Sequence, residues 1–223
     1  MRLWIAFILI TCLCASTTAR AGPWLREKGS TFSSVSVTAT YFRDFGTATY
    51  LEYGWRDHMT IGADIGTFTS REGERSGFAT VFMRRALGPN TGKNRWAYEL
   101  GVGSAWVGEL ILPHIKTGIS WGRGYELQKK NGWMVVDASM KWDLLQGQHA
   151  GKVDATVGLN FSDRTIGMLQ LYLAHLDHKF YATLAPSVVI KPRKRKFRIQ
   201  IGTEIPVDNL KSTALKLGIW REF

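Results

Sequence analysis

The chain has 223 residues, and its 29 Lys and Arg exceed its 18 Asp and Glu, which gives a formal net charge of +11. It is 45% hydrophobic and rich in Gly (23), Trp (9), Tyr (7) and Phe (11), as expected for a chain of strands, tight turns and interfacial rings. After residue 21 no run approaches eighteen consecutive apolar residues, which excludes a transmembrane helix.

The first 21 residues have the layout of a secretory signal peptide. One early positive charge at Arg2 precedes a short apolar run over residues 4–13, and Ala19-Arg20-Ala21 before Gly22 matches a cleavage site. The apolar run is too short for a spanning helix, which needs roughly twenty residues. We therefore expect an exported protein with a signal peptide over 1–21 and a mature domain over 22–223.

Both cysteines, Cys12 and Cys14, lie inside this leader. They raise a lipoprotein alternative, but the residues before them, Thr11 and Leu13, suit a lipidation site poorly. If Ala21 is the last residue removed, the mature chain has no thiol. A disulfide framework and a thiolate metal site are then excluded.

From residue 34 onward apolar and polar residues alternate in short segments separated by turn residues. Alternation with a period of two predicts strands with one apolar and one polar face. Each is roughly the nine to eleven residues that a tilted membrane-spanning strand requires. We expect about twelve strands, with ten as the alternative, and a bulge or strand end at Pro186. The segments are 34–41, 49–55, 59–66, 78–85, 95–106, 115–122, 134–142, 152–161, 165–175, 180–190, 197–202 and 212–223.

The polar faces carry charges of both signs, too many for a packed apolar core. In a closed barrel these side chains line the lumen, where balanced charges favour a network of salt bridges that narrows it. A pore for small polar solutes with weak selectivity and a packed interior with a structural or adhesive role both remain open. The predicted lumen-lining residues are Glu52, Asp64, Glu99, Lys116, Asp137, Lys141, Lys152, Asp154, Arg198, Glu204 and Lys216, with Arg84 as a further candidate.

Large aromatic residues occur on the apolar faces near strand ends. A soluble β-sandwich, the alternative fold, has no reason to place Trp there, whereas a membrane barrel gathers aromatic rings at both interfaces. Closure also removes exposed sheet edges. The sequence thus predicts an all-β, closed, antiparallel, up-and-down transmembrane β-barrel. Its predicted girdle residues are Tyr41, Tyr53, Trp55, Trp96, Trp106, Trp121, Trp142 and Phe161.

The last segment ends on Phe223, preceded by apolar residues at alternate positions, Leu215, Leu217 and Ile219. This run resembles the C-terminal insertion signal of bacterial outer-membrane β-barrels, although Arg221 stands where an apolar or aromatic residue is usual. A soluble edge strand could show the same alternation by chance. In the barrel reading, the strand is buried in lipid from one side, so alternate side chains meet the membrane.

Leader, strand pattern and terminus together resemble the small outer-membrane β-barrels of Gram-negative proteobacteria, which are of unassigned or transporter-like function. The resemblance implies a location in the outer membrane, contact with its lipid and lipopolysaccharide, and recognition of the C-terminal strand by the barrel-assembly machinery. It also implies a small-solute channel or transporter-like barrel. It carries no catalytic motif, so it predicts location better than activity.

The histidines do not form an evident catalytic site. A barrel lipid hydrolase would show a His with a Ser two positions on, and Lys116, Gly151 and Asp177 occupy those positions instead. His175-Leu176-Asp177-His178 could bind a metal or act as a general base, but a solvated hairpin turn explains it better. We expect no enzyme activity, metal or cofactor, with a His-dependent lipid hydrolase as the remote alternative.

The basic run Lys191-Pro192-Arg193-Lys194-Arg195-Lys196 is expected at a periplasmic turn, near anionic headgroups. It has no interleaved aromatic residues, so nucleic-acid binding is not predicted. The glycine-rich pieces 101–103 and 122–124 lack the strand-to-helix context of a phosphate-binding loop.

Overall fold

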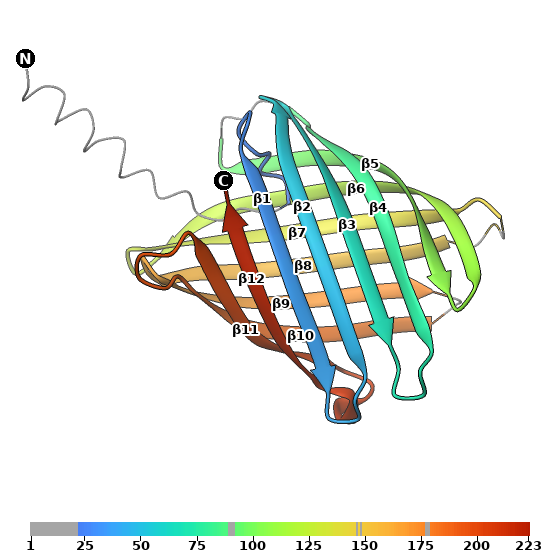
Figure 1. Cartoon of the computed structure of the whole chain (residues 1–223). Helices are drawn as coiled ribbons and strands as arrows, with labels where there is room; N and C mark the ends of the chain where they lie inside the picture. The colour runs from blue at the N-terminus through green and yellow to red at the C-terminus, as the bar shows by residue number, and fades with distance from the viewer. Residues whose placement is uncertain (1–21, 89–91, 146, 148, 177–178) are drawn as a thin grey trace, which may run out of the picture.

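The computed structural model describes residues 22–88, 92–145, 147, 149–176 and 179–223, which form a single closed β-barrel (Figure 1). The expected signal peptide at 1–21 lies outside the described residues. The strands are β1 (Thr31–Thr40), β2 (Phe45–Arg56), β3 (Met59–Thr69), β4 (Arg75–Ala86), β5 (Asn94–Val107), β6 (Leu110–Leu127), β7 (Lys130–Asp143), β8 (His149–Ser162), β9 (Thr165–Leu176), β10 (Lys179–Ile190), β11 (Phe197–Pro206) and β12 (Ala214–Glu222).

Every strand pairs antiparallel with its neighbours in sequence, and β1 pairs with β12 to close the ring. The predicted up-and-down barrel and its count of twelve strands are confirmed. At the seam, the backbone N–H of Thr31 donates to the carbonyl of Phe223, and the N–H of Phe223 donates to that of Thr31. The first and last strands are therefore paired to their ends, which leaves no open sheet edge.

The alternation of side chains decides between a membrane barrel and a sandwich. On β2, Glu52 is 1% exposed, whereas its neighbours Leu51 and Tyr53 are 40% and 41% exposed. The apolar faces thus point outward and the polar faces point into the lumen, the reverse of a water-soluble sandwich. The described strands form one closed barrel rather than the two stacked sheets of that alternative.

The barrel has two unlike ends. The terminal end carries the C-terminus, the start of β1 and the turns 57–58 and 191–196, so the basic run lies there. The distal end carries the turns 41–44, 70–74 and 108–109 and the short 3-10 helix η1 (Leu210–Ser212) (Figure 1). All of these connections are short.

Strand lengths and irregularities depart from the expectation. β5 to β8 have 14 to 18 residues, which is longer than the nine to eleven that a tilted membrane-spanning strand requires. The bulge or strand end predicted at Pro186 was wrong: β10 runs through it in an unchanged register. Only the pairing of Ala185 and Pro186 with β11 is missing, as expected for a residue without an N–H. Register shifts occur instead in β2 and β8.

None of the described residues belongs to a helix long and apolar enough to cross a membrane.

Candidate functional site

Residues 22–30, which precede β1, fold into the lumen at the terminal end; we call them the plug segment. Gly22 and Pro23 are buried, residues 24–26 are half-buried, and Glu27 and Lys28 are exposed. Contacts from this segment reach β1, β2 and β3 on one side and β6 and β7 on the other. In a ring of twelve strands these lie on opposite walls, so the segment crosses the lumen.

Arg26 fastens the plug segment to the wall of β2 and β3. Its Nε donates to Oε2 of Glu52 at 2.6 Å, and its backbone N–H donates to Oγ1 of Thr60 at 2.9 Å. Its guanidinium also lies 4.4 Å from the centre of the Phe32 ring. The plug backbone passes directly over Gly54, where a Cβ would collide with the carbonyl of Glu27. Glycine at this position therefore permits the close approach.

The other side of the plug segment is held by apolar packing. Trp24 contacts a cluster of buried inward side chains on β7, β9 and β10, and Trp220 packs against the same cluster. Pro23 and Trp24 also cover Gly122 on β6, where a side chain would displace both. The wall at the terminal end is thus apolar on one side and charged on the other. The cluster consists of Trp133, Val135, Ile166, Met168 and Val189.

Arg84 is the centre of a buried ion network beneath the plug segment. Its guanidinium bonds Oε1 of Glu52 and Oε2 of Glu99, both at 2.6 Å, and donates to the carbonyl of Gly22 at 3.1 Å. Glu99 also pairs with Lys116 at 2.6 Å. Cations and carboxylates therefore alternate from Arg26 to Lys116, and each buried carboxylate has two cationic partners. Such a network is stable only when its members are satisfied in this way.

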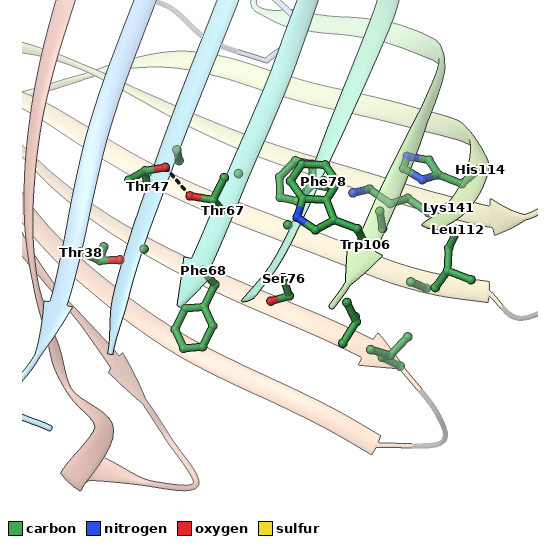
Figure 2. Close-up of a pocket in the computed structure, with 18 of the residues that line it drawn as sticks. Thr38, Thr47, Thr67, Phe68, Ser76, Phe78, Trp106, Leu112, His114 and Lys141 are labelled. Atoms are coloured by element: carbon green, nitrogen blue, oxygen red, sulfur yellow. Dashed lines mark hydrogen bonds between the residues drawn. The ribbon is translucent and has the colours of Figure 1, made fainter. Parts of the chain in front are cut away.

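The distal half of the lumen is hollow. A cavity of about 540 Å³ lies there, bounded by inward side chains from the distal parts of most strands (Figure 2). Ala48 points inward, yet it is exposed to solvent. The lining also includes Thr47, Thr67 and Trp106, which lie next to inward positions. The inward lining includes Ser36, Thr38, Ala48, Phe78, Ala105, Leu112, His114, Lys141, Ala150, Glu204 and Lys216.

The lining of the cavity includes two lysines, Lys141 and Lys216, and two carboxylates, Asp143 and Glu204. Lys141 forms no salt bridge with another described residue, and its ammonium lies over the Phe78 ring, 3.9 Å from the ring centre. His114 lies beside it in Figure 2, with Nε2 3.0 Å from Oγ1 of Thr80. Lys216 is paired with Glu204 at 2.8 Å. The cavity can therefore hold a small polar molecule, with one cation not committed to a carboxylate of the wall.

The predicted lumen-lining residues all lie on the inward face, but they divide into groups. Those in the plug network are Glu52, Glu99 and Lys116, and those at the distal cavity are Lys141, Glu204 and Lys216. Between them lie Asp64, Asp137, Asp154 and Lys152, and Arg198 lies near the start of β11, next to Gln200 and Trp220. Lys152 pairs with Asp154 at 2.7 Å.

The predicted girdle aromatics lie near both ends of the outer face. Tyr53, Trp55, Trp96, Trp121 and Phe161 are at the terminal end, where Trp96 and Trp121 face each other across β5 and β6. Tyr41, Trp106 and Trp142 are at the distal end, and Tyr41 lies just beyond β1, in the turn. Of the predicted insertion signal, Leu215, Leu217 and Ile219 point outward from β12, and Phe223 follows its last residue.

The plug segment was missed by the sequence reasoning, which began its strands at residue 34. Pro23, Trp24 and Arg26 stand between the expected cleavage site and the first alternating segment, where a mature chain would need no large apolar or cationic residue. That mismatch is the signal that could have found them. The inward apolar cluster was missed as well, because alternation reports only which residues share a face.

His175, near the end of β9, contacts Phe180 with ring centres 4.6 Å apart and ring planes tilted by 47°. Asp177 and His178, which belong to the same predicted cluster, lie outside the described residues. Within the described part of the chain, no group of three or more potential ligands could hold a metal ion. The glycine pairs at 101–103 and 122–124 lie inside β5 and β6.

Solved structures that are similar in fold include two porins and an autotransporter β domain. The KdgM porin matches with a TM-score of 0.58 and 7% identity over 87% of this chain and 99% of its own, and so does its complex with disordered oligogalacturonate. The NanC porin matches with a TM-score of 0.59 and 11% identity over 86% of this chain and 98% of its own. No protein-family model and no curated protein matches the sequence. The expected resemblance to outer-membrane barrels is thus confirmed at the level of the fold.

Proposed function

We propose that the protein is an outer-membrane channel for small polar solutes, closed at rest by its plug segment. The observation that carries this proposal is the hollow, solvent-exposed distal lumen of about 540 Å³. A barrel with a purely structural role has no need of a cavity large enough for a small ligand. In this proposal the distal end faces the outside of the cell, and the terminal end faces the periplasm.

Although Asp143 and Glu204 also line the cavity, the position of Lys141 favours a solute that carries negative charge. Lys141 offers an ammonium that no carboxylate of the described residues neutralises within salt-bridge distance, whereas Glu204 is paired with Lys216. The fold shared with two porins supports passage of a solute, and the oligogalacturonate named with KdgM is an anion. Because acids and bases are nearly balanced along the rest of the inner face, the selectivity would be weak.

Passage to the periplasm requires the plug segment to leave the lumen. Its hold consists of Arg26 on Glu52 and Thr60, and of Trp24 against the apolar cluster. Side chains make the contacts with Glu52 and the apolar cluster, whereas the bond to Thr60 uses the Arg26 backbone N–H. Side-chain substitutions therefore loosen the segment without altering the strands.

Planar-bilayer recording tests the proposal with the double variant Trp24→Ala/Arg26→Ala. We expect rare, brief openings for the unaltered protein and steady conductance for the double variant. Lys28→Ala is the matched control, because Lys28 lies in the same segment but is exposed. If the double variant assembles correctly and shows no unitary conductance, the channel proposal is wrong.

A specific observation favours a second candidate, a non-conducting barrel with a structural or adhesive role. The terminal half of the lumen is filled by buried charge pairs, with Glu52 and Glu99 1% and 5% exposed. If the second candidate is right, the distal cavity is a closed recess, and the double variant will stay silent while remaining folded.

Membrane location, assembly and the absence of enzyme activity are part of the same proposal. Export through the signal peptide would deliver the chain to the barrel-assembly machinery, which would engage β12. The outward Val, Leu and Ile side chains would then contact lipid, and the basic turn 191–196 would lie near inner-leaflet headgroups. Lipid turnover by His175→Ala and His178→Ala variants, compared with the unaltered protein, would detect a lipid hydrolase.

A further inference from the structure

Asp137 is a buried lumen carboxylate that is only partly satisfied: Ser120 hydrogen-bonds it, but one of its oxygens has no partner among the described residues, as is also true of Oδ1 of Asp154. The buried Oδ1 of Asp137 accepts no hydrogen bond from any described group. Asp137 also forms no salt bridge within the described part of the chain, although Glu52 and Glu99 each have two cations nearby. A buried, unpaired charge is costly and is found in proteins only where something compensates it.

The surroundings of Asp137 make the need for a cation stronger. Asp154 stands directly opposite it on β8, and like charges facing each other across strands are destabilising. The nearby cations are engaged: Lys152 pairs with Asp154, and Arg84 with Glu52 and Glu99. The wall of the barrel therefore supplies no ammonium for Asp137.

Gly22, the first residue after the expected cleavage site, lies against this carboxylate. A Cβ on Gly22 would be 3.2 Å from Oδ1 and 3.4 Å from Oδ2 of Asp137. Because the backbone nitrogen lies about 2.5 Å from such a Cβ, it is within about 6 Å of both oxygens. Gly22 is itself buried, and its carbonyl is held by Arg84.

We propose that Asp137 is the binding site for the α-ammonium of the processed chain. Cleavage after Ala21 hydrolyses the peptide bond to Gly22 with one water, and this gives a carboxylate on the leader and a new amine on Gly22. At neutral pH that amine is largely protonated. It then supplies the missing cation to Asp137, so the plug segment is fastened at its tip by an ion pair that the precursor cannot form.

The pocket is selective for the length of the mature chain. Gly22 has a φ of +79°, and a Cβ there would meet Cγ1 of Val135 at 2.6 Å, so a larger first residue does not fit. One additional residue would displace the ammonium by about 3.8 Å. Processing one residue earlier or later would thus leave Asp137 without its partner.

The proposal is tested by labelling the α-amine of protein expressed as the full chain and purified from membranes. A water-soluble amine-reactive reagent is added near pH 7, and mass spectrometry of the N-terminal peptide separates α-amine from lysine labelling. We expect Asp137→Asn to label at least about tenfold faster than the unaltered protein, which corresponds to the loss of about 1.4 kcal/mol of protection. Asp154→Asn is the matched control, because its carboxylate already has Lys152, and it should label at the original rate.

A second variant keeps the test decisive if Asp137→Asn fails to assemble. Insertion of one alanine between Ala21 and Gly22 leaves the barrel intact and lengthens the processed chain, and it should raise α-amine labelling to the same degree. Equal labelling of the unaltered protein and both variants, or a mature chain that begins elsewhere than Gly22, would overturn the proposal. Because the readout does not depend on conductance, it is independent of whether the barrel is a channel.

Discussion

At the terminal end the inward side chains are large or charged and meet the plug segment, whereas at the distal end many are small and enclose a cavity. The strands are the same, and so is their alternation. Arg84, Glu52 and Trp133 fill the first half; Ser36, Ala48 and Ala105 leave the second half open. The size of the inward residues, rather than the number of strands, therefore decides where this lumen is closed.

We expect the largest effect on the difference between the two halves from replacing Arg84, the centre of the ion network. Arg84→Met leaves Glu52 and Glu99 with one cation each and the carbonyl of Gly22 without its donor, so we expect a loss of about 3 kcal/mol in the free energy of unfolding. Urea unfolding in detergent, followed by Trp fluorescence, measures it. Arg85→Met, on the exposed outer face, is the control and should change little. Equal free energies of unfolding for the two variants would show that the ion network does not stabilise the terminal half of the barrel.

Filling the open half should affect passage and spare stability. Ala48→Trp places an indole in the distal cavity, and in the unplugged double variant we expect solute flux to fall on the order of tenfold because the ring occupies the solute's space. Since the position faces water, the free energy of unfolding should change by less than about 1 kcal/mol. Liposome swelling measures the flux.

The control for that substitution is Ala39→Trp, which adds the same ring to the outer face near the distal end. It should leave the flux unaltered. A similar loss of flux in both variants would mean that the distal cavity is not on the solute's route.

The smallest effect concerns charge. Lys141→Gln removes the cavity's ammonium that has no carboxylate partner, and we expect the anion-to-cation permeability ratio of the unplugged variant to fall about twofold, since salt screens charges beyond about 8 Å at physiological ionic strength. Reversal potentials in a salt gradient measure the ratio. Lys179→Gln, exposed at the distal start of β10, should have less effect. An unaltered ratio for Lys141→Gln would place the selectivity elsewhere.

Alternation in the sequence was sufficient to predict the barrel, its topology and which face points outward. These properties depend on the period of side chains along a strand, which each segment displays by itself. The inward positions of Glu52 and Lys216, for example, follow from the parity of their strands.

The division of the lumen could not be predicted in the same way. It depends on which inward residues of different strands lie at the same height in the barrel, as Glu52, Arg84 and Glu99 do. That height follows from the register of the paired strands, which the alternation of apolar and polar residues does not determine. The plug segment has no period at all, so its place inside the barrel follows only from contacts such as that of Arg26 with Glu52.

The hydrogen bonds between Thr31 and Phe223 anchor the plug segment where it joins the seam of the barrel. Residues 22–30, even fully extended, reach only about 30 Å from that anchor. A segment that has left the lumen therefore remains tethered at its mouth, at an effective concentration in the millimolar range. Re-entry of the plug segment is consequently an intramolecular event, and its rate does not depend on the protein concentration. The duration of each open interval should therefore be set by the plug segment and not by a soluble molecule that blocks the lumen.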